Sequence, residues 1–256
     1  MRVVILAGGK GIRMHEETEF LPKALIEIGN IPIICHLMDV FSHYGFNDFI
    51  LCLGYKGYQI KEYFLNYYNH NFDMTIDLEH KICVNRYAFD QKKPWTITLV
   101  ETGENTETGG RLKRIMPYID KEMFMMTYCD GLANVNLKAL VDFHKMHGKL
   151  ATVLSPVTPS KFGLLNFDKN YLVTEFGEKI PDNAFINGGF FVLDYGIFDY
   201  IDGDKTSWEY DSLPKLVKSK ELVACKFDGF WKCMDSMKDK NELTELWNKN
   251  EAPWKL

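Results

Sequence analysis

The sequence predicts an α/β fold built on a doubly wound parallel sheet. Over the first 155 residues, short apolar runs alternate with segments whose apolar residues recur at helical spacing. Hydrophobic residues make up 46% of the 256-residue chain and aromatic residues 14%, which is enough to fill a substantial core. Because no linker, internal repeat or low-complexity segment interrupts the chain, we expect a single domain over 1–256.

The pattern begins with a β-branched apolar run over 2–7, which reads as a buried strand ending at Gly8 and Gly9. A helix, a second strand and a second helix are expected to follow, over 32–45, 49–53 and 58–68. Ligands of doubly wound sheets bind beyond the carboxyl ends of the strands. The glycines after the first strand therefore lie where a ligand is expected.

The periodicity weakens over 80–94, where charged residues, Asn and Tyr follow no clear spacing, so we expect an insertion there. Beyond Pro156 the chain becomes strand-rich, which predicts a smaller β region and two closing helices. The remaining expected strands are 95–101, 123–128, 150–155, 163–167, 171–176 and 185–193, and the remaining helices begin at about 110 or span 136–147, 208–217 and 236–247.

Composition excludes several classes of protein. The formal charge of −5 and the pI of about 5.8 argue against a general nucleic-acid-binding protein but permit a local basic pocket for a phosphorylated small molecule. No apolar stretch approaches the ~20 residues of a membrane helix, and the first apolar run is too short for a signal peptide. The scattered cysteines form no Cys-x-x-Cys pair and read as buried free thiols. We expect a cytoplasmic protein with no membrane or nucleic-acid partner.

The most informative stretch is the turn Leu6-Ala7-Gly8-Gly9-Lys10-Gly11-Ile12-Arg13. Glycines allow backbone N–H groups to approach an anion closely, and the Arg13 guanidinium suits paired phosphate contacts. The turn lacks the third glycine of a dinucleotide fingerprint and the Gly-Lys-Ser/Thr of a Walker A loop. It is therefore predicted to be a phosphate loop of another kind, with an ordinary strand-to-helix turn as the alternative.

Three charged residues could complete such a site. Lys23 follows Pro22 close to the glycine turn and could fold back onto the same phosphates. Asp130 ends a predicted strand where a carboxylate could hold Mg²⁺, and Asp235 is acidic within an aromatic, apolar run, so it needs a partner such as a shared cation. A solvent lysine, a turn and a structural hydrogen bond are the respective alternatives.

Two further groups carry weaker indications. Lys179, in the pair Glu178-Lys179, could bind a second phosphate, and the turn Asn187-Gly188-Gly189 could offer an amide and bare backbone to a polyol. His144 and His147 share one face of a predicted helix, where a metal pair is possible but surface histidines are favoured. We assign these histidines no role.

Together these motifs resemble those of the sugar-phosphate nucleotidyltransferases, and most closely the members that transfer CMP from CTP to glucose 1-phosphate. The resemblance covers essentially the whole chain. It implies a Rossmann-like mixed sheet, with a nucleotide-binding part over about 1–155 and a small acceptor-side β region within about 156–256. The strings that carry it are VILAGGKG with Arg13, HEET, Pro22-Lys23, ALIEIG, LCLGYKGYQIKEYF, TGGRLKR, YCDG, FINGGFFV, GFWKCMD and APWK.

The resemblance also implies roles for individual residues. The reaction is attack of an acceptor phosphate on the α-phosphorus of CTP, without a covalent intermediate. Catalysis is assigned to Arg13, Lys23, Asp130 and Asp235, of which Asp130 and Asp235 hold Mg²⁺. The nucleotide site comprises Leu6, Ala7, Gly8, Gly9, Gly11, Ile12, Arg13, Lys23, Thr102, Gly110 and Arg111, and the acceptor site Glu178, Lys179, Asn187, Gly188 and Trp231. The implied partners are CTP and a small phosphorylated acceptor, and a homo-oligomer is expected.

The chain departs from the pattern of this family at three places. Ile12 replaces the usual Thr, Leu21-Pro22-Lys23-Ala24 replaces Lys-Pro-Lys-Pro, and Cys129 replaces the Gly before the metal aspartate. One interpretation is a cytidylyltransferase for a non-sugar phosphate, such as L-glutamine phosphate of the capsular phosphoramidate pathway or a glycerol phosphate. Another is a homologue that binds nucleotide without turning it over. Glucose 1-phosphate, giving CDP-glucose and pyrophosphate, remains the favoured acceptor.

Overall fold

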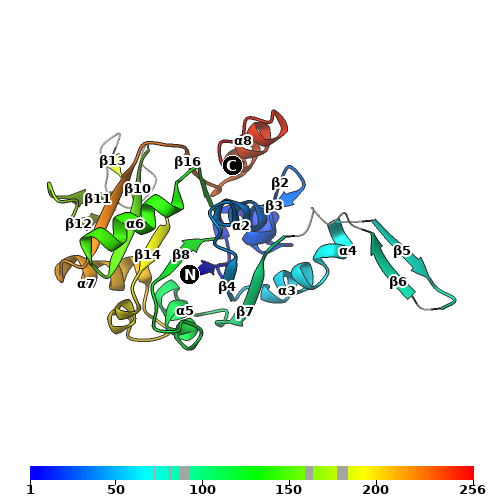
Figure 1. Cartoon of the computed structure of the whole chain (residues 1–256), viewed down its shortest axis with the longest axis horizontal. Helices are drawn as coiled ribbons and strands as arrows, with labels where there is room; N and C mark the ends of the chain where they lie inside the picture. The colour runs from blue at the N-terminus through cyan, green and yellow to red at the C-terminus, as the bar shows by residue number, and fades with distance from the viewer. Residues whose placement is uncertain (72, 81, 87–92, 159–163, 178–183) are drawn as a thin grey trace.

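The structure is a computed structural model that describes residues 1–71, 73–80, 82–86, 93–158, 164–177 and 184–256. Its central sheet contains eight strands: β1 (Arg2–Leu6), β4 (Asp48–Leu53), β7 (Thr96–Glu101), β8 (Phe124–Tyr128), β10 (Ala151–Thr158), β13 (Ala184–Phe185), β14 (Phe190–Leu193) and β15 (Leu222–Phe227). β15 pairs with β10, and the others follow the order β13-β10-β14-β8-β1-β4-β7 (Figure 1). β14 runs antiparallel to both neighbours and β13 antiparallel to β10, whereas the other pairs are parallel. The predicted Rossmann-like, doubly wound mixed sheet is confirmed.

The strand order creates a natural crevice beside β1. The chain passes from β1 outward to β4 and β7, and then returns to place β8 on the other side of β1. Such a reversal is the topological switch point at which doubly wound sheets bind ligands. Leu6 at the end of β1 is paired with Tyr128 at the end of β8. The glycine turn and Asp130 therefore leave the sheet side by side.

Both faces of the sheet are buried, which explains why its parallel strands read as continuous apolar runs. In β1 the side chains alternate: Val3 and Ile5 belong to one core cluster, Val4 and Leu6 to the other. Helices contribute to the first cluster from α2 (Ile33–His43), α3 (Gly57–Leu65), α6 (Leu137–His147) and α8 (Met237–Asn248), and to the second from α5 (Thr108–Ile115) and α7 (Leu213–Lys218).

The helix ends follow the local sequence. α6 begins where the Asn136 side chain accepts a hydrogen bond from the Ala139 N–H at 3.0 Å, and it ends at Gly148, whose φ is +62°. α2 follows Pro32 and ends two residues before Gly45, whose φ is +86°. The helix expected over 208–217 is instead a π-helical turn, η6 (Trp208–Ser212), that runs into α7.

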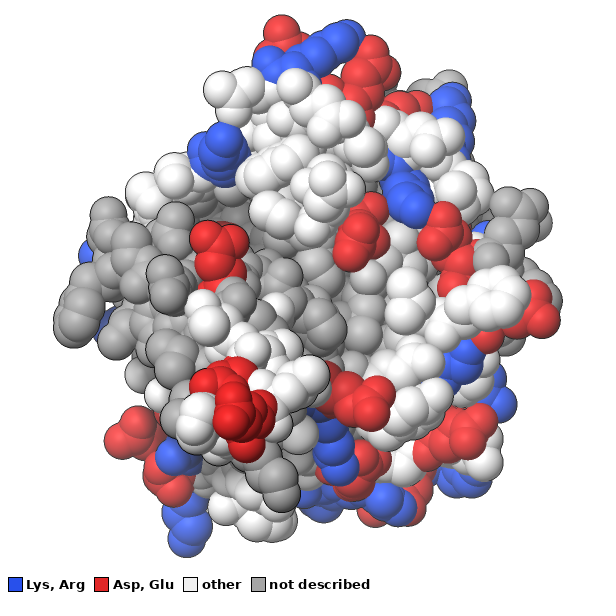
Figure 2. All heavy atoms as spheres, turned by 90° about the vertical axis from the view of Figure 1, so that its right-hand side faces the viewer, with Lys and Arg blue, Asp and Glu red and all other residues white. Residues whose placement is uncertain are grey.

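The expected insertion is a hairpin. β5 (Asp73–Asp77) and β6 (Ile82–Arg86) pair antiparallel and project beyond α4 (Tyr67–Asn71), away from the central sheet (Figure 1). The hairpin begins before the segment in which irregularity was predicted, and Ile76 and Leu78 on it are exposed. On the surface that surrounds this side of the molecule, Lys and Arg are interspersed with Asp and Glu (Figure 2).

The smaller β region is also confirmed. β11 (Leu164–Phe167) pairs with β12 (Val173–Gly177), close to the strands expected there, and β9 (Gly131–Ala133) pairs with β16 (Trp231–Cys233). Of the helices in the described ranges, none has both the length and the hydrophobicity that crossing a bilayer requires. The remaining elements are η1 (Ile12–Met14), α1 (His15–Thr18), η2 (Lys23–Leu25), β2 (Glu27–Ile28), β3 (Ile31–Pro32), η4 (Met116–Tyr118) and η5 (Tyr195–Tyr200).

Candidate active site

A cavity of about 1140 Å³ opens at the carboxyl ends of β1 and β8, at the switch point of the sheet. Most of the residues that the sequence predicts for the site line it: Leu6, Gly8, Gly9, Gly11, Arg13, Lys23, Arg111, Asp130, Asn187, Gly188, Trp231 and Asp235. Ala7, Thr102 and Gly110 do not line it, and the side chain of Ile12 and both residues Glu178 and Lys179 lie outside what the structure describes. The cavity therefore joins the predicted nucleotide side to the predicted acceptor side.

The glycines of the first turn have different physical reasons to be glycine. A Cβ on Gly8 would lie 2.1 Å from Nη1 of Arg111, so the protein itself excludes a side chain there. Gly11 has a φ of +61°, which other residues adopt at a cost. A Cβ on Gly9 would meet nothing within 4 Å, and Gly9 lines the cavity. Only Gly9 therefore presents bare backbone to the cavity without a structural need for it.

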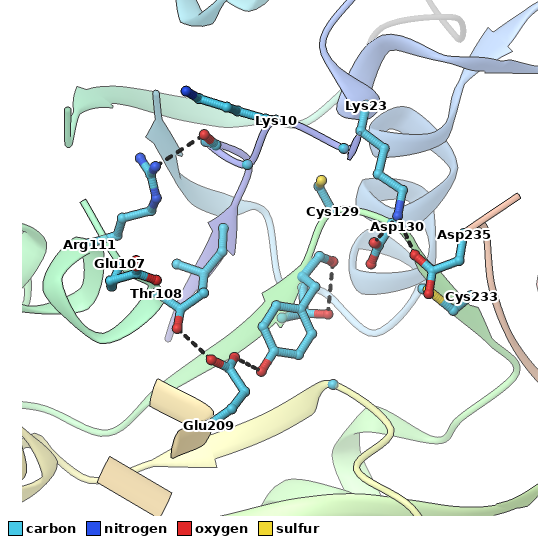
Figure 3. Close-up of a pocket in the computed structure, with 18 of the residues that line it drawn as sticks. Lys10, Lys23, Glu107, Thr108, Arg111, Cys129, Asp130, Glu209, Cys233 and Asp235 are labelled. Carbon is cyan, nitrogen blue, oxygen red and sulfur yellow. Dashed lines mark hydrogen bonds and ion pairs between the residues drawn. The ribbon is translucent and has the colours of Figure 1, made fainter. Parts of the chain in front are cut away.

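The guanidinium of Arg111 lies beneath this turn and is almost completely buried (Figure 3). Its Nη1 donates hydrogen bonds to the carbonyls of Leu53 and Gly103 and to the hydroxyl of Thr102, at 3.1, 2.8 and 2.8 Å. Its Nη2 donates to the carbonyls of Gly8 and Glu104, at 3.1 and 3.3 Å. Burial lowers the pKa of Arg111. This side chain holds the glycine turn and the 103–104 loop in place.

Two other residues predicted on the nucleotide side support the wall from behind. Thr102 is fully buried, and its hydroxyl donates to the carbonyl of Leu53 at 2.6 Å. A Cβ on Gly110 would lie 2.5 Å from the carbonyl oxygen of Asp204, so this glycine allows α5 to pack closely against that segment. The structure thus gives Thr102 a hydrogen-bonding role and Gly110 a packing role, and neither residue lines the cavity.

Two carboxylates and two cations form the charged centre of the cavity (Figure 3). The ammonium nitrogen of Lys23 lies 2.5 Å from Oδ2 of Asp130 and 2.7 Å from Oδ1 of Asp235. Arg13 reaches Oδ2 of Asp235 at 3.0 Å from an exposed position. Burial opposes the charge on Lys23, but the attraction of Asp130 and its neighbours outweighs it and raises the pKa of the ammonium. Lys23 likewise outweighs the burial of Asp235 and lowers the pKa of that carboxyl.

The two carboxylates are far apart in the sequence, and the pairing of two short strands brings them together. Asp130 follows β8, and the pairing of β9 with β16 sets Cys233 opposite Gly131. The Met234 N–H then donates to the carbonyl of Asp130 at 2.9 Å, which brings Asp235 beside it.

These residues have the donor atoms that a divalent cation needs. One ligand atom each from Asp130, Cys233 and Asp235 lies within 4.8 Å of the others. Mg²⁺ in phosphoryl-transfer sites is held by one or two carboxylates together with substrate phosphates. The two carboxylates fit Mg²⁺, whereas the thiol of Cys233 is a poor ligand for it.

The predicted acceptor side contains a turn that is bonded to an indole. The Trp231 Nε1–H donates to the carbonyl of Gly188 at 2.7 Å, and the Gly188 N–H donates to the carbonyl of Leu154 at 2.9 Å. Asn187 accepts from the Gly189 N–H at 2.9 Å through its side-chain oxygen. These contacts fix the turn that the sequence proposed as a polyol contact.

Sequence reasoning missed Glu209, which lines the same cavity from η6. Its carboxylate accepts hydrogen bonds from the hydroxyls of Tyr128, Thr108 (2.5 Å) and Ser207 (3.1 Å), and so connects β8, α5 and η6 (Figure 3). A π-helical turn is frequent at functional sites, but no sequence period announces one. The one indication was an acidic residue directly after the fully buried Trp208.

The two histidines of α6 are not surface residues as the sequence suggested. His144 is only 2% exposed, and its Nδ1 lies 2.8 Å from the hydroxyl of Thr152, while Nε2 of His147 lies 2.7 Å from the same oxygen. The expectation was wrong because α6 packs against β10 through this polar contact. Both residues are remote from the cavity lining.

The sheet, the glycine turn and the paired carboxylates together define a nucleotide-handling transferase. The sequence of the chain matches the family model for nucleotidyl transferases over residues 2–239, and the protein belongs to this family of enzymes. It is 48% identical to the glucose-1-phosphate cytidylyltransferase of Salmonella typhi, over all of this chain and 99% of that one. It is 43% identical to a probable glucose-1-phosphate cytidylyltransferase of Bacillus subtilis, over the full length of both.

Solved structures confirm the fold at lower identity. The crystal structure of HddC from Yersinia pseudotuberculosis superposes with a TM-score of 0.77 at 22% identity, covering 96% of this chain and 99% of that one. Apo UDP-glucose pyrophosphorylase gives a TM-score of 0.74 at 18% identity, covering 97% and 98%. At this level of identity the likeness extends to the fold alone.

Proposed function

We propose that this nucleotidyltransferase is an Mg²⁺-dependent cytidylyltransferase that transfers CMP from CTP to glucose 1-phosphate, giving CDP-glucose and pyrophosphate. The observation that carries the proposal is the cavity at the carboxyl ends of β1 and β8, which joins a glycine turn, two cationic side chains and two carboxylates. The names of the relatives that are 43–48% identical over the full chain support both the nucleotide and the acceptor.

The chemistry is a single displacement at phosphorus. An oxygen of the acceptor phosphate forms a bond to the α-phosphorus of CTP, the bond to the β-phosphate oxygen breaks, and pyrophosphate leaves with that electron pair. Catalysis then consists of holding both phosphates in line and neutralising the charge on the transferring group. Arg13 and Lys23 provide positive charge beside the glycine turn, and Lys179 is proposed to bind the acceptor phosphate.

Asp130 and Asp235 are the residues that would hold Mg²⁺. When bound there, the ion supplies a charge that polarises the α-phosphate and offsets the negative charge that develops on pyrophosphate. On the acceptor side, the Asn187 amide, the Gly188 backbone and the Trp231 indole are proposed to contact the hydroxyl-bearing body of the sugar.

The test measures pyrophosphate release and identifies the nucleotide product for each of CTP, UTP, GTP and dTTP with glucose 1-phosphate, and then for CTP with a glycerol phosphate and with L-glutamine phosphate. We expect CTP with glucose 1-phosphate to give the highest kcat/KM. An Asp235→Asn protein serves as the control for contaminating activity. A hundredfold preference for a non-sugar phosphate would overturn the sugar assignment. The absence of pyrophosphate release with every acceptor tested would instead support a homologue that binds nucleotide without turning it over.

A further inference from the structure

The ammonium of Lys23 lies where a divalent cation would bind. Mg²⁺ bonded to one oxygen of each carboxylate would lie about 2.1 Å from each of these two oxygens. The Lys23 nitrogen fills the space between Oδ2 of Asp130 and Oδ1 of Asp235, at 2.5 and 2.7 Å. Figure 3 shows the side chain extending into the cavity with its end between these two carboxylates. The lysine side chain is only 11% exposed, so little water screens the three charges.

The ammonium and a divalent cation therefore exclude each other at this position. Two cations that share the same pair of oxygens are separated by only a few ångströms, and in a partly buried site their repulsion is weakly screened. A cation that enters alone has to displace Lys23 and leave a buried ammonium without its partners. Displacing Lys23 breaks both of its ion pairs, with Asp130 and with Asp235, and separating a partly buried charge from its partners is costly.

A triphosphate offers Lys23 an alternative partner within reach. The stem of Lys23 runs beside the glycine turn, because a Cβ added at Gly11 would lie 3.4 Å from the Lys23 Cβ. Its backbone is fixed in η2, where the Leu25 N–H donates to the carbonyl of Pro22 at 2.8 Å. Movement is thus confined to a flexible four-carbon stem that can swing from the carboxylates toward the turn.

We propose that Lys23 acts as an exchangeable counter-ion, so that the Asp130–Asp235 site accepts a divalent cation as its complex with a nucleoside triphosphate and binds the free cation weakly. The inference rests on the proposed function, because it takes the phosphates of the nucleotide as the new partner of Lys23. When the cation and the triphosphate bind, the cation takes the place of the Lys23 ammonium between the two carboxylates. In the same step, phosphate oxygens take the place of the carboxylates as partners of the ammonium. Nucleotide and metal then bind with positive coupling.

The experiment measures binding of Mn²⁺ alone, by the loss of its free-ion EPR signal, to the full-length protein without nucleotide. Lys23→Met removes the competing charge, and we expect it to bind Mn²⁺ at least tenfold more tightly than the wild type. Lys10→Met is the matched control, since Lys10 lines the same cavity but pairs with Glu104 at 3.4 Å and is half exposed. We expect less than a twofold change for this control. Lys23→Gln, which keeps hydrogen-bonding capacity, tests the same effect with less risk to folding.

Two outcomes overturn the proposal. Mn²⁺ binding to both Lys23 variants that is no tighter than to the wild type would show that the ammonium does not compete with a cation. Tight binding that survives addition of Asp130→Asn to Lys23→Met would show that the cation lies elsewhere. The Mn²⁺ measurement requires no turnover, so it can be made whether or not the protein forms CDP-glucose. Failure to form CDP-glucose would refute the proposed function, whereas the competition between Lys23 and the cation would be judged by Mn²⁺ binding alone.

Discussion

Arg111 provides the sharpest test of how the cavity is built. Its guanidinium donates to four backbone carbonyls and one hydroxyl, yet the resemblance to the nucleotidyltransferases assigns it to the nucleotide. We predict that Arg111→Met weakens the protein and the nucleotide site together, because the glycine turn loses its support. If Arg111 instead contacted the nucleotide directly, the substitution would weaken nucleotide binding and leave the stability of the protein unchanged.

The magnitude follows from which carbonyls keep a donor. The Gly8 carbonyl still accepts from the Tyr55 N–H at 3.1 Å, and the Leu53 carbonyl from the Thr102 N–H at 3.0 Å. The carbonyls of Gly103 and Glu104 lose the Arg111 donor. Two underbonded carbonyls at about 1–3 kcal/mol each give a loss of about 2–6 kcal/mol. At about 2–4 °C per kcal/mol for a chain of this size, that loss lowers Tm by roughly 4–24 °C.

The assay combines thermal unfolding followed by circular dichroism with calorimetric titration of CTP. Arg114→Met is the control on the same helix, because Arg114 pairs with Asp204 at the exposed surface, where solvent screens the two charges and the pair adds little stability. If Arg111→Met has an unchanged Tm but does not bind CTP, the reasoning is refuted, and the guanidinium must contact the nucleotide directly.

Three further predictions concern the site and the core. Asp130→Asn should lower kcat at least about a hundredfold in steady-state assays while retaining the fold, because several kcal/mol of transition-state stabilisation are lost with the charge; near wild-type turnover would remove Asp130 from the metal site. Gly9→Ala and Gly203→Ala should each change the free energy of unfolding by less than about 0.5 kcal/mol, because a Cβ added at either position meets nothing within 4 Å. Only Gly9→Ala should weaken CTP binding, by at least tenfold. Burial lowers the pKa of His147 from 6.5 to about 4, so the unfolded state binds more protons between these values. Stability in urea should fall as pH drops from 6.5 to 4, and a slope unchanged in His147→Gln would contradict this assignment.

The elements that could be predicted are those in which buried residues follow one another, or recur at a regular spacing, along the chain. β1, β4 and β8 are covered on both faces, so their apolar runs are continuous and end sharply at polar or glycine residues. The rule that ligands bind at strand ends then places Asp130 correctly. The β5–β6 hairpin escaped prediction because it projects from the body. Polar and apolar residues alternate over 73–77, but the apolar Ile76 is exposed and belongs to no core.

Other features depend on contacts that no local pattern encodes. The pairing of β9 with β16 brings Asp235 beside Asp130. The apolar surroundings of Asp235 suggested that it needs a partner, and the family resemblance implied a shared metal, but no local spacing encodes the contact. Buried arginines are rare, and the sequence around Arg111 does not reveal that backbone carbonyls surround it. The split of the 208–217 helix into a π-helical turn, which brings Glu209 to the cavity, likewise depends on tertiary packing.

The cations of the cavity differ in how easily a ligand can replace their partners. Arg111 is held by backbone carbonyls from separate segments of the chain, and moving it would disturb all of them at once. Lys23 is held by two side-chain carboxylates that themselves border the cavity, and it reaches them on a flexible four-carbon stem. Arg13 makes one contact from an exposed position. A ligand that brings its own anions and its own cation can therefore exchange partners with Lys23 and Arg13 while Arg111 stays fixed. The guanidinium of Arg111 keeps the shape of the glycine turn. Under the proposed exchange, the ammonium of Lys23 would couple a metal to the nucleotide.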